Sequence, residues 1–202
     1  MSSNFARQAI FDTQKRVIAY EFLFRDGFRD SFPCISSDIA TQSILNDLFI
    51  QGKVTHNAIS GGLPCFVNFS YQSLVDGTAL RYPPENLVVE VLEDCPADSV
   101  LFDKLIDLKE RGYCIAFDDF IPSTDWIPFL GLADIIKIDF RAQSLDAIAD
   151  FVHEYRQKFS FQLLAEKIET KQEYHFAREL GFDLFQGYQL SKPERLPYPF
   201  VA

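Results

Sequence analysis

The chain has 202 residues, of which 48% are hydrophobic, and a formal net charge of −10. This size and composition suit one domain with a sizeable core. The acidic charge excludes nucleic acid polymers and anionic membranes as expected partners, although bound cations would admit a small anionic ligand. The N-terminus has no signal-peptide pattern, no apolar run reaches the length of a membrane span, and the four cysteines form no CxxC pair. We therefore expect a cytoplasmic protein with reduced thiols.

The chain opens with a predicted β-hairpin, with strands at 5–11 and 16–24 and a turn at 12–15. Short apolar, β-prone runs then alternate with segments of helical spacing. The expected strands cover 19–25, 65–69, 87–94, 113–119, 134–139, 162–169 and 182–188, and the expected helices cover 36–50, 70–80, 97–111, a short stretch ending at 132, 144–158 and 170–180. The Pro-rich tail, 191–199, is expected to be a closing loop or the start of a linker.

This alternation predicts an α/β fold, specifically a TIM-like (β/α)8 barrel with an antiparallel opening hairpin. The alternative is an open doubly wound sheet. That fold usually has a glycine-rich phosphate loop after its first strand, and this chain has none.

Polar side chains recur near the C-terminal ends of the expected strands. A core does not collect several carboxylates by chance, because burying one without a partner is costly. Parallel barrel strands all end at one face, so these groups are expected to meet at the barrel mouth. They are Glu21, Asn68, Glu90, Asp118, Asp119, Lys137, Glu166 and Gln186. Oxygen donors without Cys or His favour Mg²⁺ or Mn²⁺, and up to two ions are expected.

Each of these residues also has a simpler interpretation when it is taken alone. Asp118 and Asp119 also suit a cap of the next loop, Lys137 a salt bridge across the barrel mouth, and Asn68 a turn. Taken together, they favour a two-metal site for in-line attack on a phosphodiester. Lys137 and Glu166 would position the water or take its proton, and Arg25 would reach a phosphate.

An ordered series of motifs covers nearly the whole chain and resembles the EAL domain, the cyclic-di-GMP phosphodiesterase family of bacterial signalling. The motifs are Glu21-Phe22-Leu23-Phe24-Arg25, Phe66-Val67-Asn68, Glu90-Val91-Leu92-Glu93, Asp118-Asp119-Phe120, Lys137-Ile138-Asp139, Ala165-Glu166-Lys167-Ile168-Glu169-Thr170 and Phe185-Gln186-Gly187-Tyr188, followed by Ser191-Lys192-Pro193. Within the family the chain is most similar to EAL–HDOD proteins. The resemblance implies that 1–202 is an EAL domain, either on its own or as the EAL half of a longer EAL–HDOD protein.

The resemblance also implies roles for individual residues. Glu21, Asn68, Glu90 and Asp118 would hold the first metal, and Asp118, Asp119 and Glu166 the second. Lys137 and Gln186 would position water, with Glu166 as the base. Leu23, Arg25 and Pro193 would contact the ligand.

Two departures from the family pattern bear on activity. A Gly-Thr-Gly loop follows the DDF motif in active members, whereas this chain has Ile121-Pro122-Ser123. Proline fixes φ and removes an amide donor, and the β-branched Ile121 lacks the conformational freedom of glycine. In addition, Lys167 replaces a glycine beside Glu166 and brings a cation to a proposed metal.

Two function hypotheses follow from these features. One is a weak or catalytically silent regulatory module that senses a ligand or contacts another protein, and the lost glycine loop favours it slightly. The alternative is an active phosphodiesterase that opens cyclic-di-GMP to the linear dinucleotide pGpG, which the intact ligand set favours. The Asn68 and Gln186 motifs argue against an enolase-like barrel. The expected partners are cyclic-di-GMP, an HDOD domain or another signalling protein, and a second copy of the chain. The apolar segment 126–130 would either form the contact of a homodimer or belong to the core, which is slightly favoured.

Overall fold

The structure is a computed structural model and describes residues 2–24, 41–42, 44–50 and 59–197. Part of the helix expected at 36–50, namely 36–40 and 43, lies outside these ranges, as does Arg25. A π-helix, η1 (Asn46–Ile50), lies in the described part of that expected helix.

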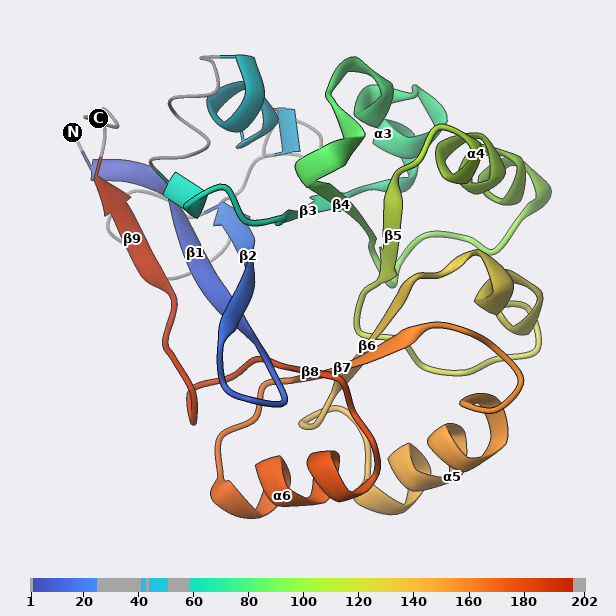
Figure 1. The fold of residues 1–202 in the computed structure, drawn as a ribbon. Coiled ribbons are helices and arrows are strands. Elements are labelled where there is room, and N and C mark those ends of the chain that lie inside the picture. Colours follow the sequence, from blue (N-terminus) through green and yellow to red (C-terminus); the bar gives the residue numbers. More distant parts are fainter. Residues whose placement is uncertain (1, 25–40, 43, 51–58, 198–202) are drawn as a thin grey trace.

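Eight strands close into a barrel (Figure 1). Strands β1 (Ser2–Asp12) and β2 (Val17–Phe24) form the predicted antiparallel hairpin. Neighbouring strands from β2 through to β8 pair in parallel. Strand β8 then pairs antiparallel with the C-terminal end of β1, which completes the ring. The remaining barrel strands are β3 (Cys65–Phe69), β4 (Leu87–Val91), β5 (Cys114–Phe117), β6 (Ile135–Asp139), β7 (Gln162–Glu166) and β8 (Leu184–Phe185). The TIM-like barrel with an opening hairpin is thus confirmed.

Helices surround the barrel on its outer side (Figure 1). They are α3 (Tyr71–Val75), α4 (Ser99–Glu110), α5 (Leu145–Tyr155) and α6 (Lys171–Glu179), with short 3₁₀ segments η2 (Thr78–Arg81), η3 (Pro84–Asn86) and η4 (Ile127–Leu132). The caps Asp98, Ser144 and Thr170 each accept a backbone N–H of the first turn, which fixes where α4, α5 and α6 begin. Within the described residues, no helix has the length and apolarity that crossing a membrane requires.

Two of the sequence-based expectations differ from the structure. The single helix expected at 70–80 is α3 followed by η2, because Gly77 takes a left-handed φ of 66° between them. The tail contains a strand, β9 (Glu194–Pro197), where only a loop or linker was expected. It pairs with the N-terminal half of β1. That half is available because β8 pairs with β1 only at Phe11 and Asp12 among the described residues.

Side chains alternate between the two faces of every barrel strand, as the two-residue period of a strand requires. The outward-facing residues form the large core between barrel and helices, and include Val67, Val89 and Leu163. The inward-facing residues form a separate apolar layer that fills the barrel below its mouth. This apolar layer takes one residue from each barrel strand: Ile10, Ala19, Phe66, Val88, Ala116, Ile135, Leu164 and Leu184.

Candidate metal and ligand site at the barrel mouth

A ring of polar side chains lies one step above the apolar layer. Two residues further along each strand toward the mouth, the apolar residue is replaced by a polar one, because side chains on the same face recur every second residue. We call this set the polar ring; it consists of Gln8, Glu21, Asn68, Glu90, Asp118, Lys137, Glu166 and Gln186. The structure therefore brings together at one level the strand-end residues that the sequence singled out, apart from Asp119.

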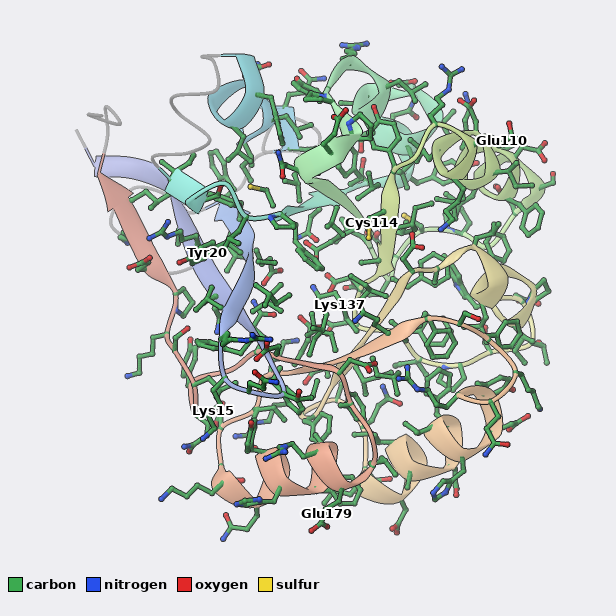
Figure 2. All side chains as sticks on the ribbon, in the orientation of Figure 1. Lys15, Tyr20, Glu110, Cys114, Lys137 and Glu179 are labelled. Atoms are coloured by element: carbon green, nitrogen blue, oxygen red, sulfur yellow. The ribbon has the colours of Figure 1, made fainter. Side chains whose placement is uncertain are left out.

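The ammonium group of Lys137 lies at the centre of the polar ring. Lys137 has no exposed surface and lies within the ring of strands (Figure 2). Its Nζ lies 2.6 Å from Asp118 Oδ1, 3.0 Å from Glu166 Oε1 and 3.5 Å from Glu21 Oε1, and it also contacts Glu90 Oε1. The salt bridge across the barrel mouth, one of the two sequence interpretations of Lys137, is present. Through one cation it links four carboxylates, which β2, β4 and β7 and the residue after β5 carry.

Two glutamines of the polar ring make hydrogen bonds that involve the chain after β8. Gln186 Nε2 donates to Glu21 Oε2 over 2.7 Å in a buried hydrogen bond, which fixes the second oxygen of that carboxylate. Gln8 faces the same pocket, and its Nε2 donates to the carbonyl oxygen of Ser191 over 3.1 Å.

Several buried oxygens of the ring accept no hydrogen bond from any residue that the structure describes. They are Asn68 Oδ1, Glu166 Oε2 and both oxygens of Glu90, although Glu90 Oε1 is in ionic contact with Lys137. Asn68 lies inside β3 and is not the turn residue of the alternative interpretation. Buried oxygens without a donor are costly, and a divalent cation would compensate for that cost. The donor set is all oxygen, so it fits Mg²⁺ or Mn²⁺.

Burial and charge shift the pKa values of the ring in one direction. Burial raises the pKa of Glu90 and of Glu166 well above the ordinary value, and the neighbouring carboxylates add to this while Lys137 opposes it. Burial alone would lower the pKa of Lys137, but the surrounding carboxylates Asp118, Glu166, Glu21 and Glu90 raise it well above its usual value. The lysine therefore stays charged. A bound divalent cation would reverse the shifts of the two glutamates.

A second acidic group lies beside the ring. Carboxylate oxygens of Asp118, Asp119 and Glu166 all lie within 4.8 Å of one another. These are the three residues expected to serve a second metal. Burial raises the pKa of Asp119, and the charge of Asp118 adds to that effect. Lys167 reaches into this group and pairs with Asp119.

The pocket above the ring has a volume of about 380 Å³. Leu23 and Pro193, two of the residues expected to contact a ligand, line it, together with Arg141, Lys167 and Tyr188. Arg25, the third, lies outside the described residues. The pocket thus combines carboxylates at its floor with cations and a tyrosine at its rim, which suits a ligand with both phosphate and ring systems.

The altered loop after β5 connects Asp119, which lines the pocket, to an aromatic cluster around Trp126. Ile121 is 60% exposed, whereas Trp126 is half-buried. The Trp126 ring lies 5.1 Å from Phe117 and 5.0 Å from Phe129, centroid to centroid. These contacts favour the core interpretation of the segment 126–130.

Sequence reasoning missed Gln8, Asp139 and Arg141. Gln8 lies on β1, which runs antiparallel to the other barrel strands, so its side chain reaches the mouth before the apolar-layer residue and not after it. The available signal was its position two residues before Ile10. Asp139 appeared only inside a motif, yet its Oδ2 lies 2.5 Å from Lys167 Nζ. Arg141 lines the pocket and pairs with Glu169, a contact between two loops that no local pattern predicts.

The model of the EAL domain family matches residues 51–193, and the chain belongs to that family. Cyclic di-GMP phosphodiesterase CdgJ of Vibrio cholerae is 39% identical over 199 residues, which are 98% of this chain and 46% of CdgJ. Protein YuxH of Bacillus subtilis, described as uncharacterized, is 33% identical over 193 residues, covering 93% of this chain and 46% of YuxH.

The chain spans about half the length of these curated relatives. Among solved structures, the YkuI protein of Bacillus subtilis, which has an EAL domain and was crystallised with cyclic-di-GMP and calcium, superposes with a TM-score of 0.75. That alignment covers 95% of this chain and 56% of YkuI at 23% identity, which supports the fold alone.

Proposed function

We propose that this chain is an EAL domain that binds cyclic-di-GMP through Mg²⁺ or Mn²⁺ in the polar ring and hydrolyses it slowly or not at all. The observation behind the binding proposal is that Asn68 Oδ1, Glu90 Oε2 and Glu166 Oε2 are buried below an open pocket and accept no hydrogen bond from the described residues. Such oxygens are rare in folded proteins, and a bound cation would satisfy them.

The residues of the ring would divide the work. Glu21, Asn68, Glu90 and Asp118 would hold the first ion, and Asp118, Asp119 and Glu166 a second. The ions would supply charge neutralisation at the phosphoryl oxygens and a more acidic water. Glu166 would accept the proton of that water, Lys137 and Gln186 would orient it, and Leu23, Arg25 and Pro193 would contact the ligand.

The low turnover in this proposal rests on the loop after Asp119. Pro122 has no N–H to donate, and the exposed Ile121 stands where active members of the family have a conformationally free glycine. A loop with those residues orders the second-ion group less well. The domain would then report the presence of its ligand instead of removing it.

The alternative is an active phosphodiesterase that yields pGpG. The similarity to CdgJ, a protein named for that activity, favours it, and so does the complete set of metal-binding side chains. The two functions share a binding site and differ only in rate.

The wider setting is also a proposal. We propose that 1–202 is one EAL domain that acts in the cytoplasm and relays its state to an HDOD domain or another signalling protein, or to a second copy. The free, largely buried thiols of Cys65, Cys95 and Cys114 fit a reducing compartment.

A turnover assay with Mn²⁺ separates the two functions. Wild type and Glu21→Ala are incubated with cyclic-di-GMP, and the linear product is quantified by chromatography. We expect wild type to form the linear product slowly or not at all. Rapid product formation by wild type that disappears in Glu21→Ala would establish the active alternative.

A further inference from the structure

Lys167 adopts a backbone conformation that lysine rarely takes. Its φ is 55°, and that of Asp119 is 40°, so the two residues at the ends of this ion pair both lie in the left-handed region. Such a conformation costs about 1–3 kcal/mol for a non-glycine residue and persists only where surrounding contacts impose it. The contacts are present for Lys167: the next residue, Ile168, donates its N–H to the Gln186 carbonyl and accepts the N–H of Gln189.

The side chain of Lys167 bridges two carboxylates beside the polar ring. Nζ lies 3.2 and 3.1 Å from the two oxygens of Asp119 and 2.5 Å from Asp139 Oδ2. Asp119 is thus held by an ammonium group while it also belongs to the acidic group with Asp118 and Glu166. One carboxylate cannot serve both cations fully, because a divalent ion bound there would be repelled by an ammonium a few ångströms away.

The Lys167 side chain is also free to leave. It is 49% exposed and lines the open pocket, whereas the Lys137 side chain is fully buried. Moving its ammonium into solvent would release Asp119 without disturbing the polar ring.

We propose that Lys167 is a tethered cation that sets the number of divalent ions in this site, so that one ion binds readily and a second binds only when the ammonium moves off Asp119. This inference rests on the proposed function, since it requires the ring to bind a first ion. The chain would then hold its ligand with one ion and gain the second, and with it faster hydrolysis, only when something displaces Lys167. The chemistry of such a trigger is an anionic group, other than the phosphates of the ligand itself, that competes with Asp119 for Lys167.

Counting bound Mn²⁺ tests the inference without measuring activity. Calorimetric titration gives the stoichiometry, and electron paramagnetic resonance distinguishes an isolated ion from a spin-coupled pair. Wild type is compared with Lys167→Met, which keeps the length of the side chain, and with Lys167→Gly, which also suits the left-handed backbone and guards against misfolding. Lys167→Arg preserves the charge. Lys171→Met, on the exposed start of α6, is the matched control.

We expect wild type, Lys167→Arg and the control to bind one ion tightly. Lys167→Met and Lys167→Gly should bind a second with affinity increased at least about tenfold and show the coupled spectrum, as removal of a unit charge close to a divalent ion predicts. A coupled pair in wild type at the same Mn²⁺ concentration, or one ion in both uncharged variants, would overturn the inference. Absence of any bound Mn²⁺ in every variant would instead overturn the proposed metal site itself, and the inference with it.

Discussion

Glu90 is the most deeply buried carboxylate of the polar ring, and it contacts the ammonium group of Lys137. Its side chain is fully buried, and neither oxygen accepts a hydrogen bond within the described residues. Glu90→Gln keeps the shape and removes the charge, so we expect Mn²⁺ affinity to fall by at least about tenfold, the loss that follows from about 1.4 kcal/mol of lost interaction. The metal-free variant should be about as stable as wild type at mildly acidic pH, where the raised pKa of Glu90 already keeps its carboxyl group neutral.

Calorimetric Mn²⁺ titration and urea denaturation in chelator measure the two effects separately. The control is Asp150→Asn, an exposed carboxylate on α5. Unchanged Mn²⁺ affinity in Glu90→Gln would place the ion elsewhere.

The raised pKa values of Glu90 and Glu166 predict how stability depends on pH. Burial keeps these carboxyls protonated in the folded, metal-free protein to a higher pH than in the unfolded chain. Their contribution to stability is therefore fully present below the unfolded pKa, about 4.3 for Glu, and is lost as pH rises through the raised folded pKa.

Denaturation in chelator, from about pH 4.5 upward, should consequently show a free energy of unfolding that falls with pH more steeply in wild type than in Glu90→Gln. Saturating Mn²⁺ should remove that difference in slope, because the cation favours the ionised carboxylates. Equal slopes for the two metal-free proteins would mean that Glu90 is ionised without a metal.

At the scale of elements, the segment after β8 depends on one glycine. Gly187 has a φ of 151°, and a Cβ at this position would lie 2.2 Å from the carbonyl oxygen of Ile168. Gly187→Ala therefore forces the backbone of Ile168 or of the neighbouring Gln186 to move. We expect a loss of about 1–3 kcal/mol in the free energy of unfolding and weaker Mn²⁺ binding, because Gln186 orients Glu21.

Gly131→Ala is the matched control, since a Cβ there meets nothing within 4 Å. Urea denaturation of both variants measures the difference. Equal stability of the two variants would contradict the close approach of Gly187 and Ile168.

Two apolar residues before η4 should respond differently to substitution by glutamate. Trp126 is half-buried and packs among Phe117, Phe120 and Phe129, so Trp126→Glu should lower the free energy of unfolding by about 1–3 kcal/mol through the loss of those ring contacts. Ile121 is exposed, so Ile121→Glu should leave stability unchanged. Thermal denaturation compares the two. A stable Trp126→Glu protein with altered self-association would restore the interface interpretation.

Most elements follow from local sequence signals, and the exceptions have physical reasons. The strands β3 and β6 and the caps of α4, α5 and α6 could be predicted because apolar runs and capping residues act locally. The strand β9 could not, because it forms only where β1 offers an unpaired edge. The residues of the site fall into the same two groups. The strand-end carboxylates could be predicted from local sequence, whereas the Lys167–Asp139 contact depends on how two distant segments of the chain meet.

At the scale of the whole molecule, the barrel gives the chain both a stable core and a charged mouth. The apolar layer closes the barrel below, and the polar ring uses the next inward position of every barrel strand. The net charge of −10 disfavours a large anionic partner, but a cation at the mouth reverses the sign locally. Binding of an anionic dinucleotide should therefore depend strictly on a divalent metal.

Calorimetric titration of cyclic-di-GMP into the metal-free protein, with and without Ca²⁺, tests this central claim most directly. Ca²⁺ takes the same oxygen ligands and avoids complications from turnover. We expect binding with Ca²⁺, none in chelator, and none in Glu90→Gln at the same Ca²⁺ concentration. Equal binding with and without metal, or no binding under any of these conditions by a folded wild-type protein, would contradict it.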